Sequence, residues 1–124
     1  MIMSKLALII EDDEDLANIF AEALRGVGFE VEIIADGKVG QERLFGTKSV
    51  PFLVLLDMHL PYVSGADLLA GMKKDERFNN TTIIITTADA RMGETYGDQV
   101  DFVLIKPISF VQLRDLTSRL MHKG

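Results

Sequence analysis

Four short segments of the chain place reactive side chains directly after a run of apolar residues. They are EDDED (residues 11–15), Asp57, Thr86-Thr87-Ala88 and Lys106-Pro107. Carboxylate and hydroxyl oxygens bind cations, and an ammonium group binds anions through charge-assisted hydrogen bonds. If the four segments meet in space, they predict an oxygen-lined pocket with one fixed positive charge beside it.

Each segment also has a purely structural interpretation. Asp13 or Glu14 can complement the positive end of a following helix, Asp57 can be a turn residue, and Lys106 can be a solvated strand end. Five consecutive acids, however, repel one another by more than a helix dipole offsets. Because all four segments are predicted at the same edge of one sheet, we favour a functional site over four unrelated surface features.

The apolar runs themselves predict five β-strands, at residues 6–10, 29–34, 52–56, 82–86 and 102–105. Continuous apolar runs of this length are typical of parallel strands that helices cover on both faces. The second run alternates more and is expected to be half-exposed.

Helical periodicity fills the intervals, at residues 15–28, 37–46, 65–74 and 109–123. The first helix is expected to bury one face and to stop at Gly26 or Gly28; that face comprises Leu16, Ile19, Phe20, Ala23 and Leu24. Ser109 is expected to cap the last helix, with four residues pointing inward: Val111, Leu113, Leu116 and Leu120. The segment 89–101 has two glycines and little apolar periodicity, so any helix there is short.

A βα unit repeated five times predicts an α/β fold, namely a doubly wound five-stranded parallel sheet in a single domain over residues 1–124. In such sheets, ligands bind beyond the carboxyl ends of the strands. The four chemical segments lie at those ends, which is why we expect them to meet.

Composition narrows the class of protein. The 124 residues are 48% hydrophobic and 26% charged, with a net charge of −6 and no cysteine. The acidic balance argues against nucleic-acid binding by this domain, and the lack of cysteine excludes disulfides and thiolate metal sites. No apolar run approaches the length of a membrane span or of a signal peptide, so a cytoplasmic domain without membrane contact is expected.

The chain resembles the receiver domain of two-component response regulators. The resemblance rests on LIIEDDEDL, VLLDMHLPYVSG, IIITTAD and IKP, which occur in the family's order and cover essentially the whole chain. Its most specific element is the spacing of Asp57, Pro61 and Gly65. The resemblance implies a flavodoxin-like (CheY-like) sheet with strand order 2-1-3-4-5 and a short or irregular fourth helix.

The resemblance also implies a chemistry. Asp57 would accept a phosphoryl group from a sensor histidine kinase or a histidine phosphotransfer protein. Mg²⁺ would be held by Asp12, Asp57 and the backbone carbonyl of His59, with Glu11 acting through water. Four further residues would complete the site. Lys106, Thr87 and the backbone of Ala88 would contact the phosphoryl group, and Pro107 would follow a cis peptide bond.

By the same resemblance, the domain would be no enzyme beyond its own phosphorylation and dephosphorylation, and its downstream effector is not identified. One alternative is a pseudo-receiver that folds without being phosphorylated, although acids, acceptor and lysine are all present. Another is a haloacid-dehalogenase-like phosphatase, which requires a second aspartate where this chain has His59. His59 and Asp89 are interpreted equally well as neighbours of the phosphoryl group or as surface residues.

The resemblance also points to a difference in signal output. Most receivers carry an aromatic residue three positions before the lysine, where this chain has Val103. The stretch from Thr87 to Lys106 is also about three residues shorter than the family habit. We therefore expect the fourth helix and its loops to respond by ordering or disordering rather than through a ring that rotates inward.

Overall fold

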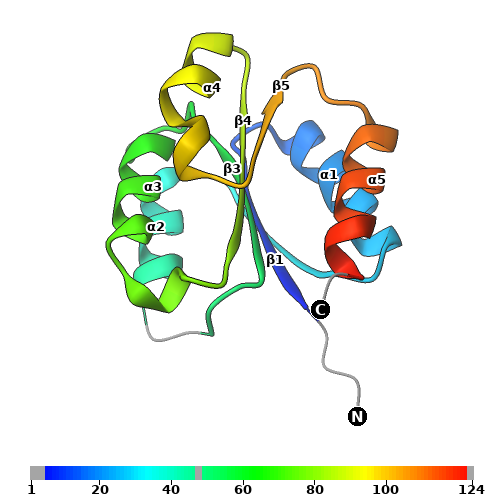
Figure 1. Ribbon diagram of the computed structural model, residues 1–124, viewed down its shortest axis with the longest axis horizontal. Coiled ribbons are helices and arrows are strands. Elements are labelled where there is room, and N and C mark those ends of the chain that lie inside the picture. The colour runs from blue at the N-terminus through cyan, green and yellow to red at the C-terminus, as the bar shows by residue number, and fades with distance from the viewer. Residues whose placement is uncertain (1–4, 47–48, 123–124) are drawn as a thin grey trace.

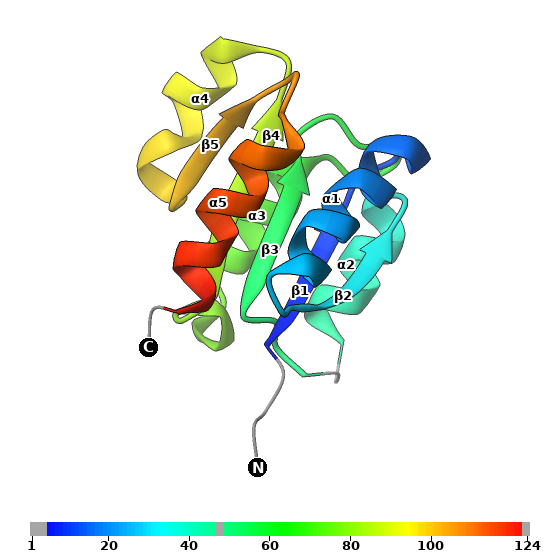
Figure 2. The ribbon, with the colours of Figure 1, turned by 90° about the vertical axis from the view of Figure 1, so that its right-hand side faces the viewer.

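A computed structural model of the chain describes residues 5–46 and 49–122. Its five strands form one parallel sheet in the order β2-β1-β3-β4-β5, which confirms the predicted topology. The strands are β1 (Leu6–Ile10), β2 (Glu30–Ile34), β3 (Leu53–Asp57), β4 (Thr82–Thr87) and β5 (Phe102–Ile105). Their carboxyl ends all point to the same edge of the sheet (Figure 2).

Helices cover both faces of the sheet (Figure 1). One face carries α1 (Glu14–Gly26) and α5 (Phe110–Met121), and the other carries α2 (Gly37–Phe45), α3 (Gly65–Lys73) and α4 (Ala90–Tyr96). Two short 3₁₀ segments, η1 (Glu76–Phe78) and η2 (Gly97–Gln99), follow α3 and α4. The predicted last helix was drawn to residue 123, which lies outside the described residues.

Strand alternation divides the apolar side chains into two cores. In β1, Ala7 and Ile9 belong to the core under α1 and α5, whereas Leu8 and Ile10 belong to the core under α2 and α3. All four side chains are fully buried. A strand that is covered on both faces has no polar side, which explains why the run reads as continuously apolar.

The predicted helix ends are largely confirmed. Asp13 caps α1 by accepting the N–H of Leu16, and Ser109 caps α5 by accepting the N–H of Gln112. The stop after α1 falls at Gly28, whose φ of 109° is in the region that favours glycine.

Two predicted core residues are wrong. Ile19 is 42% exposed and Val111 is 51% exposed. The buried stripe of α1 is centred on Phe20 and Leu24, and Ile19 lies 100° or more from both at 100° per residue, beyond the edge of the stripe. In α5, Thr117 takes the inward position, and Val111 likewise faces solvent.

The fourth helix is as short as the sequence predicted. It has seven residues, none of which is buried, and Asp89 caps it by accepting the N–H of Arg91. Gly93 brings the helix close to β5, because a Cβ atom at this position would lie 3.0 Å from Cγ1 of Val103. The helix therefore depends on a few half-buried contacts for its attachment to the sheet.

Gly65 determines how closely α3 approaches the end of β3. A Cβ atom at this position would overlap the carbonyl oxygen of Asp57 and lie 2.6 Å from the Cα atom of Met58. Only glycine lets the helix begin directly beside the strand end that carries Asp57.

We predict that Gly65→Ala lowers the free energy of unfolding by about 1–3 kcal/mol, because backbone atoms must move to admit the methyl group. Gly26→Ala is the matched control, since nothing lies within 4 Å of a Cβ atom there. This control should gain about 0.5–1 kcal/mol from its helical position. Urea denaturation measures both variants, and equal stabilities would contradict the steric argument.

Candidate functional site

The carboxyl edge of the sheet brings together the side chains that the sequence singled out. Lys106, directly after β5, places its Nζ atom 2.7 Å from Oε1 of Glu11 and 3.6 Å from Oδ2 of Asp57. Glu11 follows β1, and Asp57 is the last residue of β3. Glu11 and Asp57 are each only 2% exposed. One ammonium group thus lies between two buried carboxylates from different strands.

Backbone hydrogen bonds hold these strand ends in place. Oδ1 of Asp57 accepts the N–H of His59 at 3.0 Å, and Oε2 of Glu11 accepts the N–H of Asp13 at 3.3 Å. The N–H of Lys106 donates to the carbonyl of Thr87 at 2.8 Å, which ties the lysine to the neighbouring strand. Each carboxylate therefore has one oxygen near the ammonium group and one held by the local turn.

Burial and neighbouring charge shift the pKa values of this cluster. Burial, reinforced by the carboxyl group of Asp57, raises the pKa of Glu11 to about 7, although the hydrogen bond from Lys106 opposes the shift. For Lys106, burial alone would lower the pKa, but the hydrogen bond to Glu11 and the charge of Asp57 outweigh it and raise the pKa. The cluster carries more negative charge than one ammonium group neutralises.

Three acids are placed so that they could hold a cation. Glu11, Asp12 and Asp57 each offer a carboxylate oxygen, and these oxygens lie within 4.8 Å of one another. Asp12 is the exposed member of the group. Asp13 instead caps α1, as the sequence suggested for Asp13 or Glu14. An all-oxygen set of this size fits a hard cation such as Mg²⁺.

Thr87 lies at the end of β4 with no exposed surface. Its hydroxyl oxygen accepts the N–H of Asp89 at 3.0 Å and lies 3.4 Å from Nε2 of His59. Ala88, which lies between Thr87 and Asp89 in the chain, is exposed. The hydroxyl group is thus close to the acidic cluster in the fold but is bonded on the side of α4.

Three further positions complete the comparison with the sequence. The Lys106-Pro107 peptide bond is cis, as the resemblance implies. The Asp89 carboxylate pairs with Arg91 at 3.1 Å, and this hydrogen-bonded pair lowers the pKa of Asp89. Sequence reasoning missed Met92, whose Sδ atom lies 3.5 Å from Oγ1 of Thr87. Six scattered methionines gave no signal that could have singled it out.

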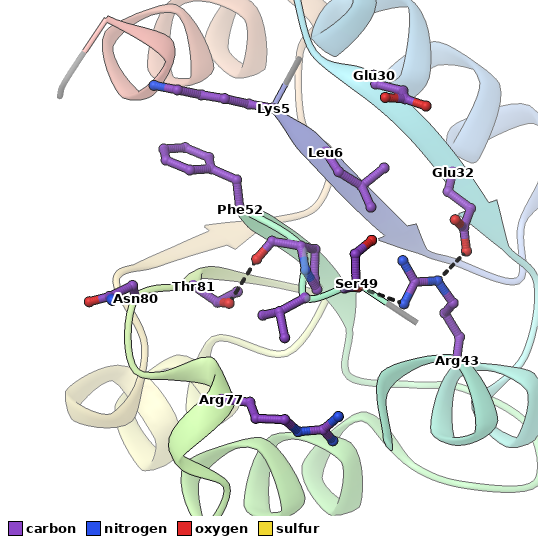
Figure 3. Close-up of a pocket in the computed structure, with 12 residues that line it drawn as sticks. Lys5, Leu6, Glu30, Glu32, Arg43, Ser49, Phe52, Arg77, Asn80 and Thr81 are labelled. Carbon is purple, nitrogen blue, oxygen red and sulfur yellow. Dashed lines mark hydrogen bonds and ion pairs between the residues drawn. The ribbon is translucent and has the colours of Figure 1, made fainter. Parts of the chain in front are cut away.

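A cavity of about 710 Å³ lies at the opposite edge of the sheet, among the starts of the strands (Figure 3). Its positive side chains already have partners. Arg43 pairs with Glu32 at 2.7 Å, and Arg77 pairs with Asp75 at 2.8 Å. Lys5 donates to the carbonyl of Met121 at 2.8 Å. This cavity offers no counterpart to the acid and lysine cluster, so the chemistry belongs to the carboxyl edge.

Comparison with known proteins identifies the receiver domain that the sequence resembled. The family described as the response regulator receiver domain matches residues 7–118. The "probable methanogenesis regulatory protein FilR2" of Methanothrix harundinacea is 32% identical over 118 residues, covering 88% of this chain and 76% of that protein. The sensory transduction protein RegX3 of Mycolicibacterium smegmatis is 32% identical over 119 residues, covering 94% of this chain but only 50% of RegX3.

Solved structures share the fold. A CheY-like receiver domain from Methylobacillus flagellatus superposes with a TM-score of 0.81 at 24% identity, covering 95% of this chain and 99% of that one. A CheY-like receiver domain protein from Methanospirillum hungatei has a TM-score of 0.74 at 25% identity, with 96% and 92% covered.

The parallel sheet, with acids and a lysine at its carboxyl edge, agrees with the receiver class that these comparisons indicate. The chain belongs to the response regulator receiver domain family, and it is a receiver of two-component signalling. Receiver domains are in general signalling modules rather than enzymes. They bind Mg²⁺ at an acidic site, and the cluster of Glu11, Asp12 and Asp57 is compatible with such a site. Among the described residues, no helix has the length and apolar character that crossing a membrane requires.

The ion pair leads to a stability prediction. Lys106→Met should lower the free energy of unfolding by about 3 kcal/mol in metal-free buffer, because it leaves two buried carboxylates without their cation. Adding Glu11→Gln should recover part of that loss by removing one unpaired charge. Lys74→Met, on the exposed end of α3, should stay within about 0.5 kcal/mol of the parent. Chemical denaturation measures all four proteins, and a Lys106→Met variant as stable as the parent would contradict the prediction.

Proposed function

We propose that this chain, as a single receiver domain, accepts a phosphoryl group on Asp57 from a sensor histidine kinase or a histidine phosphotransfer protein. The observation that carries the proposal is the placement of a buried Asp57 carboxylate at a strand end, beside Lys106 and two further acids. A carboxylate oxygen attacks phosphorus, the phosphorus–nitrogen bond of the donor histidine breaks, and an acyl phosphate forms on Asp57. The donor imidazole keeps the electron pair of the broken bond.

The proposed metal is Mg²⁺, held by Asp12, Asp57 and the backbone carbonyl of His59, with Glu11 reaching it through water. When bound, Mg²⁺ would neutralise the negative charge that otherwise keeps an anionic phosphoryl group away from a carboxylate. The carboxylate oxygens of Glu11, Asp12 and Asp57 lie within 4.8 Å of one another, which supports this ligand set.

The remaining residues would orient the phosphoryl group. The ammonium group of Lys106 would shift from Glu11 to a phosphoryl oxygen, since Asp57 is already within 3.6 Å of it. The Thr87 hydroxyl and the N–H of Ala88 would bind a second oxygen. Pro107 shapes the loop that carries the lysine.

The chain would act on its own phosphorylation and dephosphorylation and on no other substrate. Because it spans half of RegX3, the activity of any longer protein and its downstream effector are not assigned from this domain. Its net charge of −6 disfavours direct nucleic-acid binding.

We predict that acetyl phosphate with Mg²⁺ raises the intact mass by one phosphoryl group, and that Asp57→Asn abolishes this rise. The reason is that acid cluster, acceptor and lysine already lie together. Mass spectrometry under non-acidic conditions measures the product. Labelling that persists in Asp57→Asn would overturn the assignment, and no labelling of the parent would support the pseudo-receiver alternative.

We also predict that millimolar Mg²⁺ raises the melting temperature by relieving repulsion among the three acids. Asp12→Ala should lose this rise, whereas the neighbouring Asp13→Ala should keep it. Loss of the helix cap should make Asp13→Ala about 1 kcal/mol less stable with or without metal. Thermal melts in EDTA and in Mg²⁺ measure the rise for each protein. A rise that is lost in Asp13→Ala but kept in Asp12→Ala would show that Asp13 is the ligand.

A further inference from the structure

The hydroxyl group of Thr87 has several groups within reach, two residues on the side of α4 and one, His59, in the segment after β3. Besides the N–H of Asp89, the groups within reach are Sδ of Met92 at 3.5 Å, the carbonyl of Asp89 at 3.4 Å and Nε2 of His59 at 3.4 Å. A hydroxyl group has one proton to donate. A bond from Thr87 to a phosphoryl oxygen on Asp57 must therefore replace whichever bond its proton makes in the resting protein.

Met92 is the partner that belongs to a helix with little other anchorage. It lies in the first turn of α4, is half-buried, and packs against the same core as Tyr96, Val100 and Val103. No residue of α4 is fully buried. A change at Met92 consequently alters a large share of what holds α4 on the sheet.

The chemistry of methionine suits a contact that must be broken. A thioether sulfur is a weak hydrogen-bond acceptor, and its side chain has three rotatable bonds that allow it to repack into a changed space. Val103 is stiff and short, and a Cβ atom at Gly93 of α4 would lie 3.0 Å from its Cγ1 atom, so it has little space in which to move. Among the side chains within hydrogen-bond reach of the Thr87 hydroxyl group, those of His59 and Met92, only Met92 belongs to α4.

We propose that Met92 is a positioning residue for Thr87, and that it links occupation of Asp57 to helix α4. The thioether holds the hydroxyl proton toward α4 in the resting protein. When the Thr87 hydroxyl group instead donates to a phosphoryl oxygen on Asp57, Met92 loses this contact. The first turn of α4 then loses part of its attachment. The inference rests on the proposed phosphorylation of Asp57.

The test uses beryllofluoride with Mg²⁺ as the phosphoryl mimic on the full chain, with ¹³C in the methionine methyl groups. Bound fluoride is detected separately by ¹⁹F NMR. The Met92 methyl resonance should shift on binding, whereas that of Met72, which is buried in the same core on α3, should stay in place. In Thr87→Val, any beryllofluoride-dependent shift of Met92 should be lost.

Met92→Leu keeps the volume of the side chain and removes the acceptor. This variant should bind beryllofluoride about two- to fivefold more tightly, because the Thr87 hydroxyl is no longer held back, and its α4 amide signals should change less on binding. Met72→Leu is the matched control and should behave as the parent does.

The possible failures are distinguishable. Absence of any bound fluoride signal in the parent would overturn the proposed function, and the inference with it. Bound fluoride with an unmoved Met92 methyl resonance would overturn the role of Met92 alone. Parent-like affinity together with parent-like α4 shifts in Met92→Leu would do the same.

Discussion

The acids at the carboxyl edge of the sheet outnumber the one ammonium group beside them, and the rest of the site depends on this imbalance. Parallel strands deliver Glu11 and Asp57 to adjacent positions, and burial deprives both of solvent. One ammonium group, from Lys106, stands against them. Such a cluster favours the binding of a further cation. The register of β1 and β3 keeps the two carboxylates adjacent. Hydrogen bonds in the turns hold each carboxylate, and the loop after β5 holds the lysine beside them.

The two neighbouring aspartates after β1 show how the chain divides its acids. Asp13 accepts the N–H of Leu16 and is committed to starting α1. Asp12, one residue earlier, is exposed and shares a cluster with Glu11 and Asp57. Separating these tasks lets α1 keep its cap in every state of the site. The acidic run therefore divides the helix cap and the proposed metal site between different residues.

The apolar runs sufficed to predict five parallel strands and the placement of Glu11, Asp57 and Lys106 at their ends, because buried parallel strands are continuously apolar. The strand order came from the resemblance to receiver domains. The sequence was less informative about helix faces: alanines and a threonine, rather than Ile19 and Val111, line the cores. It gave nothing about Met92. That contact depends on how the turn after β4 folds back on Thr87, and no periodicity describes such a turn.

The close approach of Gly93 to Val103 means that substitutions at these two positions depend on each other. A Cβ atom at position 93 would lie only 3.0 Å from Cγ1 of Val103, so a larger residue at position 93 has no room unless Val103 or the helix shifts. A lineage with a side chain at position 93 is therefore expected to change position 103 or the place of its fourth helix at the same time. Substitutions at 93 and 103 should be inherited together, and homologues should fall into two groups with few intermediates.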